Sequence, residues 1–316
     1  MPFFTDQNPE VAQGASWPQW VEEARLNDSL AAQAYEGTPP QWRAAIKTGL
    51  ALAHMHFGSD PGQLRDMRSD GHLGFWRRSE SHAAPWAIIA FTPAYAAAAR
   101  LAAACIPAIL AGVPLIGAVC VGGQPHRAAM VSLELSGIED VFVLNAPGLH
   151  KLLEESRPGP GRLVLLHAGE LAPTVELAQS MGLPCWQEYR PPKLGLVEAD
   201  NSDDGKSLAD DGSRIDLEAL YFAQAEALGM ATSITAQMPS GGPRGTDMPF
   251  ARDAQLPDAL YLASGDQEQA DLLHGKAFSA SAPGLTLTPG CEGFWLHPGL
   301  TPDFFRVRCL TFGMLP

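Results

Sequence analysis

The stretch "WAIIAFTPAYAAAARLAAACIPAILAGVPLIGAVCV", residues 86–121, decides the expected fold. Its first six residues form a short apolar run typical of a buried strand, and a second run of this kind, "LIGAVCV", covers residues 115–121. Between them, the segment from Tyr95 to Leu110 is rich in alanine and predicts a helix that is bent or restarted near Pro107. Two buried strands joined by one helix need a crossover connection, which predicts parallel strands.

The same alternation continues along the chain. Helices are predicted at 126–137, 147–155 and 171–182, and strands at 140–145, 162–167 and 194–199. Strands joined by single helices predict a mostly parallel sheet that is covered on both faces, which is a Rossmann-like arrangement. Residues 1–85 are expected to be mainly helical, and a helix followed by a strand is expected within 215–236. Two segments rich in small and polar residues, 198–216 and 238–255, are expected to be exposed loops.

The length of 316 residues suggests two domains, and the net charge of −14 excludes some classes of function. Such an acidic surface repels phosphate backbones, so we expect no binding of nucleic acid. The five cysteines include no CxxC pair, which argues against a zinc ribbon, and their odd number in so long a chain argues against a disulfide scaffold. The first ten residues do not have the pattern of a signal peptide, which predicts a cytoplasmic protein.

One stretch, Leu101–Val121, has no charged residue over nearly the length of a membrane span. Pro107 and the sequence Gly112-Val113-Pro114 interrupt it, and its two parts differ in composition. A buried helix followed by a buried parallel strand gives the same apolar run, so we expect no membrane segment here.

Short motifs in the sequence do not identify a functional site. "VCVGGQPHR" (119–127) places two glycines between a strand and a helix, but the GxGxxG spacing is absent, so a tight turn is favoured over a phosphate site. His54 and His56 are two residues apart, and they would point to different sides of a helix. Cys291 in "PGCEGF" could be a nucleophile on a loop, although a lone loop cysteine is seldom catalytic.

Several segments, taken in order, resemble histidinol dehydrogenase. "IPAILAGV" (106–113) is similar to that family's "IPAKVAGV", and "LSGIEDVFVLNAPGL" (135–149) is similar to its "LAGVDEVYRIGGAQA". "YFAQAEALG" (221–229) lies where the family has "LLSQAEHG", and "LPDALYL" (256–262) lies where it has "APEHLEI". The order and spacing of these segments hold from about residue 25 to about residue 290.

The resemblance implies an α/β fold with two Rossmann-like doubly wound domains, like those of aldehyde and histidinol dehydrogenases, and a helical N-terminal arm. The first domain would comprise residues 1–89 and 194–316, and the second would comprise 90–193. A ligand is expected in the cleft between them. The family continues beyond the position of Pro316, so this chain is expected to be shortened at its C-terminus.

The resemblance also implies a site that has lost most of its chemical groups. The family binds zinc through the glutamine and histidine of "QAEH", and here Gln224 remains while Ala227 replaces the histidine. Asp258 and Ala259 stand where the family has its acid–base glutamate and histidine, so Asp258 and Glu226 would be catalytic remnants. One glutamine does not hold a metal, so zinc is expected to be absent.

The family's "GPGN", which lies along the cofactor cleft, is "HAGE" in this chain. By this resemblance His167, Gly169 and Glu170 are the candidate residues for binding NAD. The family's substrate loop "GPSE" is "PPKL" at 191–194, which removes a hydroxyl and a carboxylate.

Three functions remain open from the sequence. The first is a histidinol-dehydrogenase-like scaffold without zinc-dependent oxidation, which binds a small molecule or a protein. The alternative is an NAD(P)-dependent alcohol or aldehyde oxidoreductase with altered catalytic residues. The third is an interaction subunit, either in a homodimer or with a partner protein, in which the apolar tail 303–316 is exposed. Packing of this tail on its own domain is the favoured alternative to that exposure.

Overall fold

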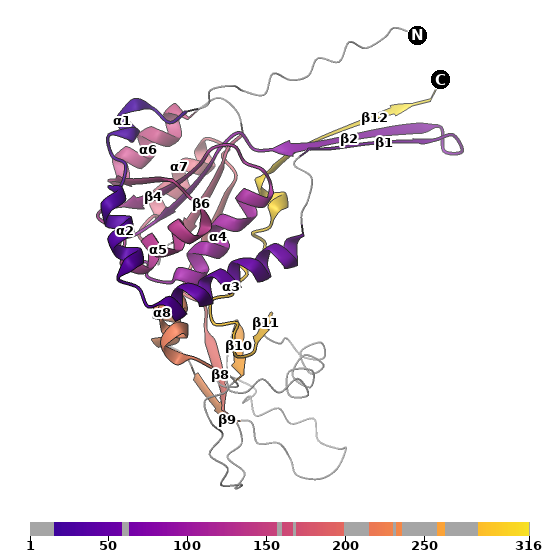
Figure 1. Cartoon of the computed structure of the whole chain (residues 1–316). Coiled ribbons are helices and arrows are strands. Elements are labelled where there is room, and N and C mark those ends of the chain that lie inside the picture. Colours follow the sequence, from indigo (N-terminus) through magenta and orange to yellow (C-terminus); the bar gives the residue numbers. More distant parts are fainter. Residues whose placement is uncertain are drawn as a thin grey trace, which may run out of the picture.

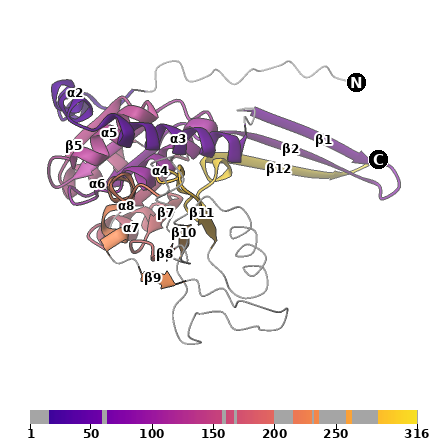
Figure 2. The ribbon, with the colours of Figure 1, turned by 60° about the horizontal axis from the view of Figure 1, so that its bottom comes forward.

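The structure is a computed structural model of the whole chain. It describes residues 16–58, 63–156, 160–166, 169–198, 215–229, 232–235, 258–262 and 284–315. The described part forms a body with two parallel sheets and a long antiparallel arm that projects from it (Figures 1 and 2).

The larger sheet has five parallel strands in the order β5-β4-β3-β6-β7. These strands are β3 (Ala87–Phe91), β4 (Ile116–Val121), β5 (Asp140–Leu144), β6 (Arg162–Leu166) and β7 (Cys185–Glu188). The connecting helices are α4 (Ala98–Leu110), α5 (Arg127–Ser136), α6 (Ala146–Glu155) and α7 (Ala172–Ser180). The expected pattern of strands joined by crossover helices is therefore confirmed for this part of the chain.

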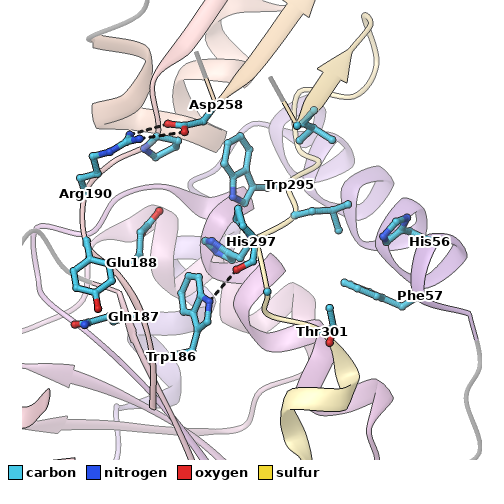
Figure 3. A pocket seen from close by; sticks show the side chains of 17 residues that line it. His56, Phe57, Trp186, Gln187, Glu188, Arg190, Asp258, Trp295, His297 and Thr301 are labelled. Carbon is cyan, nitrogen blue, oxygen red and sulfur yellow. Dashed lines mark hydrogen bonds and ion pairs between the residues drawn. The ribbon is translucent and has the colours of Figure 1, made fainter. Parts of the chain in front are cut away.

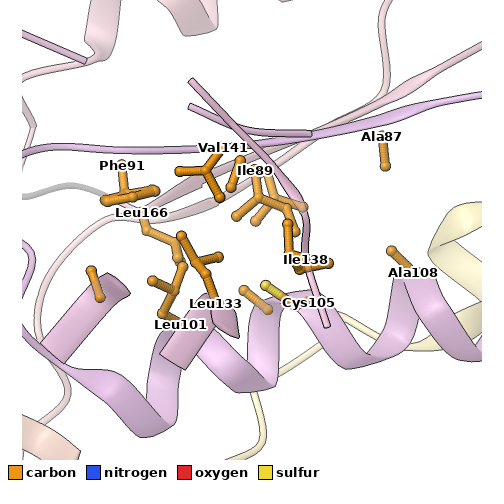
Figure 4. Packing of buried hydrophobic residues seen from close by; sticks show 14 of the residues in the cluster. Ala87, Ile89, Phe91, Leu101, Cys105, Ala108, Leu133, Ile138, Val141 and Leu166 are labelled. Carbon is orange, nitrogen blue, oxygen red and sulfur yellow. The ribbon is translucent and has the colours of Figure 1, made fainter. Parts of the chain in front are cut away.

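The two faces of this sheet are covered because successive side chains of a strand point to opposite sides. In the central strand β3, Ile89 and Phe91 pack with residues of α4 and α5, among them Leu101 (Figure 4). Ile88 and Ala90 belong to the opposite cluster, which includes side chains of α6 and α7. All five residues of β3 are fully buried, which explains why the strand appears in the sequence as an unbroken apolar run.

The uncharged stretch Leu101–Val121 contains most of α4 and all of β4, as the break at Gly112–Pro114 predicted. The helix begins at Ala98, three residues later than expected, and continues through Pro107 to Leu110. Within the described residues, no helix combines the length and the apolar character that a bilayer crossing needs.

A second parallel sheet has the order β11-β10-β8-β9. Its strands are β8 (Leu194–Glu198), β9 (Thr232–Thr235), β10 (Ala259–Leu262) and β11 (Leu285–Leu287), and helix α8 (Leu217–Gly229) precedes β9. Helices α1 (Gln19–Glu22), α2 (Asp28–Glu36) and α3 (Pro40–Phe57) come first in the chain. Helices α3, α4 and α8 contact one another, and Ile46, Ala102 and Leu220 from these helices share one buried cluster with Tyr261 of β10.

The arm is a three-stranded antiparallel sheet in the order β1-β2-β12. It consists of β1 (Gln63–Asp70), β2 (Phe75–Ala83) and β12 (Arg306–Met314), which follows the short 3-10 helix η1 (Pro302–Phe305). The expectation that residues 1–85 are mainly helical is wrong here, because 63–83 form a hairpin. "QLRDMRSD" has too few apolar residues to show a strand pattern, and its pairing depends on β2 and on the distant strand β12.

The C-terminal tail both packs and projects. Pro302 and Phe305 are buried against the body, whereas the side chains of Arg308, Leu310 and Phe312 on β12 are exposed. The first half of the segment 303–316 therefore packs on its own domain, whereas side chains in its second half are exposed.

Candidate ligand pocket between the two sheets

A pocket of about 680 Å³ lies where the carboxyl end of the five-stranded sheet meets the first residues of the four-stranded sheet (Figure 3). Open α/β sheets bind ligands at the carboxyl ends of their parallel strands. The lining comes from the end of β7 and the residues after it, from the starts of β10 and β11, from the end of α3, and from the loop before η1. These segments are far apart in the sequence, so the pocket is a product of the tertiary fold.

Aromatic side chains form much of the pocket wall. Trp186 donates its indole N–H to the carbonyl oxygen of Pro298 at 3.0 Å, and its ring meets the ring of His297 edge to face at 4.9 Å between centroids. Trp295 packs on the other side of His297, and Phe57 at the end of α3 also lines the pocket. Walls of this kind favour a planar or apolar ligand.

A buried polar cluster lies behind this wall. Glu188, at the end of β7, accepts a hydrogen bond from the Tyr95 hydroxyl at 2.8 Å and forms an ion pair with Arg100 at 2.6 Å. The Arg100 side chain is only 1% exposed, and its guanidinium also lies over the Tyr95 ring. A buried charge pair of this kind needs both partners, so these side chains hold the wall in one arrangement.

His297 is buried beside this cluster. Its Nε2 lies 2.7 Å from the carbonyl oxygen of Arg100, and because a carbonyl can only accept, this nitrogen carries the proton. Burial lowers the pKa of His297, although the nearby carboxylate of Glu188 acts in the opposite direction. The ring is therefore expected to be neutral near pH 7 and to serve as part of the wall.

Asp258 lies at the pocket just before β10, and it is held as a carboxylate. Arg190 binds it through two nitrogens, at 2.7 and 3.2 Å, and the backbone N–H of Lys193 donates to it at 2.7 Å. Burial of the Asp258 carboxyl favours a higher pKa, but these hydrogen bonds outweigh it and lower the pKa. A carboxylate whose pKa is lowered and that already accepts three hydrogen bonds is a weak general base.

The other predicted catalytic and metal-binding residues do not come together at this pocket. Gln224 is fully buried in α8, and its Nε2 donates to the Tyr261 hydroxyl at 3.2 Å. Burial raises the pKa of Tyr261, so this hydroxyl stays protonated. The backbone of Glu226 belongs to α8, next to a break at Ala225, where φ is +29°; the position of its side chain is outside the described part. Gln224 is not among the residues that line the pocket.

The two positions where the resemblance predicted lost histidines are packed. Ala227 and Ala259 are both fully buried and belong to one cluster, in which Tyr261 and Leu194 also lie. Gln224 together with these apolar side chains does not fit a zinc ion, which needs three or four N, O or S ligands. Elsewhere in the described ranges, too, no three His, Cys, Asp or Glu side chains are grouped as a metal site requires.

The candidate NAD-binding residues are only partly described. His167 lies outside the described residues, whereas Gly169 and Glu170 follow β6 at the carboxyl end of the larger sheet. Gly169 has a φ of +106°, a conformation that favours glycine. Neither residue lines the pocket, so the structure does not bring them together with Asp258.

Sequence reasoning missed the groups that build the pocket, chiefly Trp186, Glu188, Arg190 and Trp295. The signal that could have found them is "CWQEYR" (185–190), in which aromatic and charged residues end a strand of a parallel sheet. This strand is short and only partly apolar, so its sequence does not predict a place in the sheet.

Comparison with known proteins supports the fold. No protein-family model matches the sequence, and no curated protein does. Among solved structures, a histidinol dehydrogenase from Elizabethkingia anophelis is similar with a TM-score of 0.53 and 12% identity, over 92% of this chain and 77% of that chain. A succinate-semialdehyde dehydrogenase from Burkholderia pseudomallei has a TM-score of 0.46 and 11% identity, over 91% of this chain and 82% of that chain.

The chain therefore has a distant dehydrogenase-like fold of the α/β, Rossmann-like class, which confirms the expected fold class. Identity this low shows the fold alone. Membership of the histidinol dehydrogenase family, and the division into residues 1–89 with 194–316 and residues 90–193, stay predictions.

Proposed function

We propose that the protein binds a small organic molecule in the pocket between its two sheets and does not perform zinc-dependent oxidation of histidinol. The pocket itself supports this proposal: it has the volume of a small-molecule site, and its aromatic wall is held in place by the buried pair of Arg100 and Glu188. A pocket that is formed before binding costs little reorganisation when the ligand enters.

The chemical groups argue against the family's reaction. Asp258 is tied to Arg190, and Gln224 is turned toward Tyr261 inside the protein. Loss of a general base alone lowers a rate by about 10²–10⁴-fold, and here the metal-binding histidine is replaced as well. A scaffold that keeps a ligand site and lacks these groups is suited to binding.

An NAD(P)-dependent oxidoreductase with other catalytic residues is the second candidate. Its support is the position of Gly169 and Glu170 after β6, because β6 and β4 lie on opposite sides of β3, where the strand order reverses. Open sheets bind dinucleotides at such a switch point. The cofactor would supply hydride acceptance, and this chain's residues would hold and orient it.

The test is a thermal-shift and tryptophan-fluorescence screen of the full chain. The probes are NAD⁺, NADP⁺, L-histidinol and a fragment library of small aromatic acids and amines. A ligand bound only by the folded state must raise the melting temperature, and Trp186 and Trp295 place two fluorophores at the pocket. We expect at least one fragment to raise the melting temperature and change the fluorescence, with no oxidation of histidinol.

A pair of matched variants locates the binding. Gly284 lines the pocket, and no atom of the described residues lies within 4 Å of the position that a Cβ would take, so Gly284→Phe is designed to place a large side chain at the pocket. Gly71 in the arm is equally open, so Gly71→Phe is the control. The proposal fails if every fragment that binds the parent chain binds the Gly284→Phe variant equally well. Saturable NAD⁺ binding with reduction of the cofactor by an added alcohol or aldehyde would favour the second candidate.

A further inference from the structure

A second cavity, of about 400 Å³, lies near the amino end of β5, the edge strand of the larger sheet. Its lining comes from the segment that begins α2, from the second half of α5, and from the turn between α5 and β5. Helices α2 and α5 contact each other along one side of the body (Figure 1). Of the described residues, none lines both this cavity and the first pocket, which is at the carboxyl end of the same sheet.

The floor of this cavity is apolar and is fixed by its backbone. Leu26, Leu133, Ile138 and Val141 line it, and none of them is more than 8% exposed. The backbone N–H of Leu26 donates to the carbonyl oxygen of Val141 at 2.7 Å, and that of Ile138 donates to the carbonyl oxygen of Leu133 at 3.0 Å. The cavity is therefore formed before a ligand enters, which lowers the cost of binding.

The rim of the cavity carries three exposed carboxylates, those of Asp28, Glu134 and Glu139. Within the described ranges, none of the three forms an ion pair. Glu134 lies in the last turn of α5, where the negative end of the helix dipole disfavours a carboxylate. Charges of one sign therefore surround an apolar floor, and a cation bound at the rim would reduce their repulsion.

Arg25 also lines the cavity, but its charge is already balanced. Its guanidinium forms ion pairs with Glu22 at 2.6 Å and with Asp140 at 2.8 Å, and it donates to the backbone carbonyl oxygen of Glu139 at 2.9 Å. In this group two carboxylates surround one guanidinium, so the group as a whole adds negative charge. The cavity is therefore suited to a positively charged ligand.

We propose that this cavity binds an organic cation, namely a primary amine whose apolar body lies on the floor and whose ammonium group faces Glu134 and Glu139. Burial of the apolar body supplies affinity, and the carboxylates select the charge. A carboxylate on the ligand would be repelled by the rim, so an amino acid should bind more weakly than the amine with the same side chain. The inference does not depend on the proposed function, because the two cavities have separate linings.

The test is isothermal titration calorimetry of the full chain with three probes that share one ring and differ in charge. 2-Phenylethylamine is the cation, L-phenylalanine is the zwitterion and 3-phenylpropionate is the anion. We expect saturable binding of the amine at millimolar concentration, which weakens as salt is added because exposed charges are screened. The zwitterion and the anion should bind at least about tenfold more weakly.

A charge variant shows whether the rim carboxylates select the amine. Glu134→Gln/Glu139→Gln keeps the shape of both side chains and should weaken amine binding by about 3- to 10-fold, because each exposed ion pair contributes little. Its control is Glu154→Gln/Glu176→Gln, which removes the same charge from exposed positions on α6 and α7 and should leave binding unchanged.

A second pair of variants locates the apolar body of the ligand. Ala31 on α2 lines the cavity, so Ala31→Phe places a ring there and should abolish amine binding. The neighbouring residue Ala32 is exposed and does not line the cavity, so Ala32→Phe is the control. Circular dichroism checks that all variants fold.

Amide hydrogen exchange of the parent chain gives a measurement that does not depend on these variants. Saturating amine should slow exchange in the last turn of α5 and at the start of β5. The proposal is overturned if the amine does not bind saturably, if 3-phenylpropionate binds equally well, or if the charge variant or Ala31→Phe binds the amine like the parent chain. It is also overturned if Gly284→Phe abolishes amine binding, because the amine would then occupy the first pocket.

Discussion

The substitution Glu188→Gln tests whether the buried ion pair holds the pocket wall. The side chain of Arg100 is almost fully buried, and its ion-pair partner Glu188 is 10% exposed. Glutamine has the same shape and can still accept the hydrogen bond from Tyr95, but it has no charge to balance the guanidinium. The variant therefore isolates the charge pair from the packing.

The magnitude follows from the burial of the pair. Removing one partner of a buried ion pair costs roughly 3–5 kcal/mol, because the other charge remains buried without compensation. Glutamine keeps part of the hydrogen bonding at position 188, so we expect the free energy of unfolding to decrease by the lower end of this range, about 3 kcal/mol. For a chain of 316 residues, the unfolding entropy corresponds to a decrease in melting temperature of about 4–5 °C.

The assay is urea unfolding followed by tryptophan fluorescence and circular dichroism, in a double-mutant cycle with Arg100→Met. Replacing both partners by uncharged side chains removes both charges of this pair, so the double variant should be more stable than the sum of the two single changes predicts. Tyr95→Phe is the control, because it removes the hydroxyl that donates to Glu188 and leaves both charges in place, which should cost about 1 kcal/mol. Additive effects of the two charge changes, or a Glu188→Gln variant as stable as the parent, would refute the reasoning.

Three further predictions concern other contacts. In Gly49→Ala, the new Cβ would lie 1.8 Å from the carbonyl oxygen of Gly293, so α3 must move away from the loop that contains Gly293. We expect the free energy of unfolding in urea to decrease by an amount on the order of 2–4 kcal/mol. Asp258→Asn removes the ion pair with Arg190. Both side chains of this pair are more than one third exposed, so the free energy of unfolding should decrease by less than about 1 kcal/mol at pH 7. Because folding lowers the pKa of this carboxyl, that difference should be present above its unfolded pKa and vanish as the pH falls through its folded pKa. Arg162→Met should expose the base of β12, seen as faster amide exchange there, with the parallel sheets unchanged.

Each of these predictions has its own check. Gly71→Ala has open space at its Cβ position and should leave the stability unchanged, in contrast to Gly49→Ala. A pH-independent difference for Asp258→Asn would mean that the carboxyl is not stabilised by its ion pair. Equal exchange at β12 in the Arg162→Met variant would show that the hydrogen bonds of Arg162 to the carbonyl oxygens of Phe304 and Arg306 do not anchor the arm.

The larger sheet was predictable because its signals are local. The five residues of β3 and most of β4 are buried on both faces, so each appears as an apolar run, and α4 between them is rich in alanine. Such runs depend on neighbouring residues only. The arm was not predictable in this way, because β1 becomes a strand through pairing with β2, and β2 pairs with β12 from the far end of the chain. In β1 only Leu64 and Met67 are apolar, so the sequence of this strand shows no apolar alternation.

The pocket was unpredictable for a related reason. Trp186 and His297 are more than a hundred residues apart, and each by itself is an ordinary residue in its local sequence. Asp258 was found because it lies at a position that resembles a known motif. The resemblance could not show that Arg190 pairs with the Asp258 carboxylate, since that contact joins two segments that are distant in the sequence.

The packing around Gln224 bears on the prediction that the protein binds no zinc at this residue. Ala227 lies three residues after Gln224 in α8, and Ala259 lies two residues before Tyr261 in β10. Both alanines are fully buried in the cluster that joins α8 to β10, and the Tyr261 hydroxyl accepts the hydrogen bond of the Gln224 amide. A metal ligand must point into a space that an ion can enter, whereas this interior is occupied by close-packed side chains. An imidazole at Ala227 or Ala259 would have to fit into this buried cluster, so a histidine at either position would change the packing as well as the chemistry.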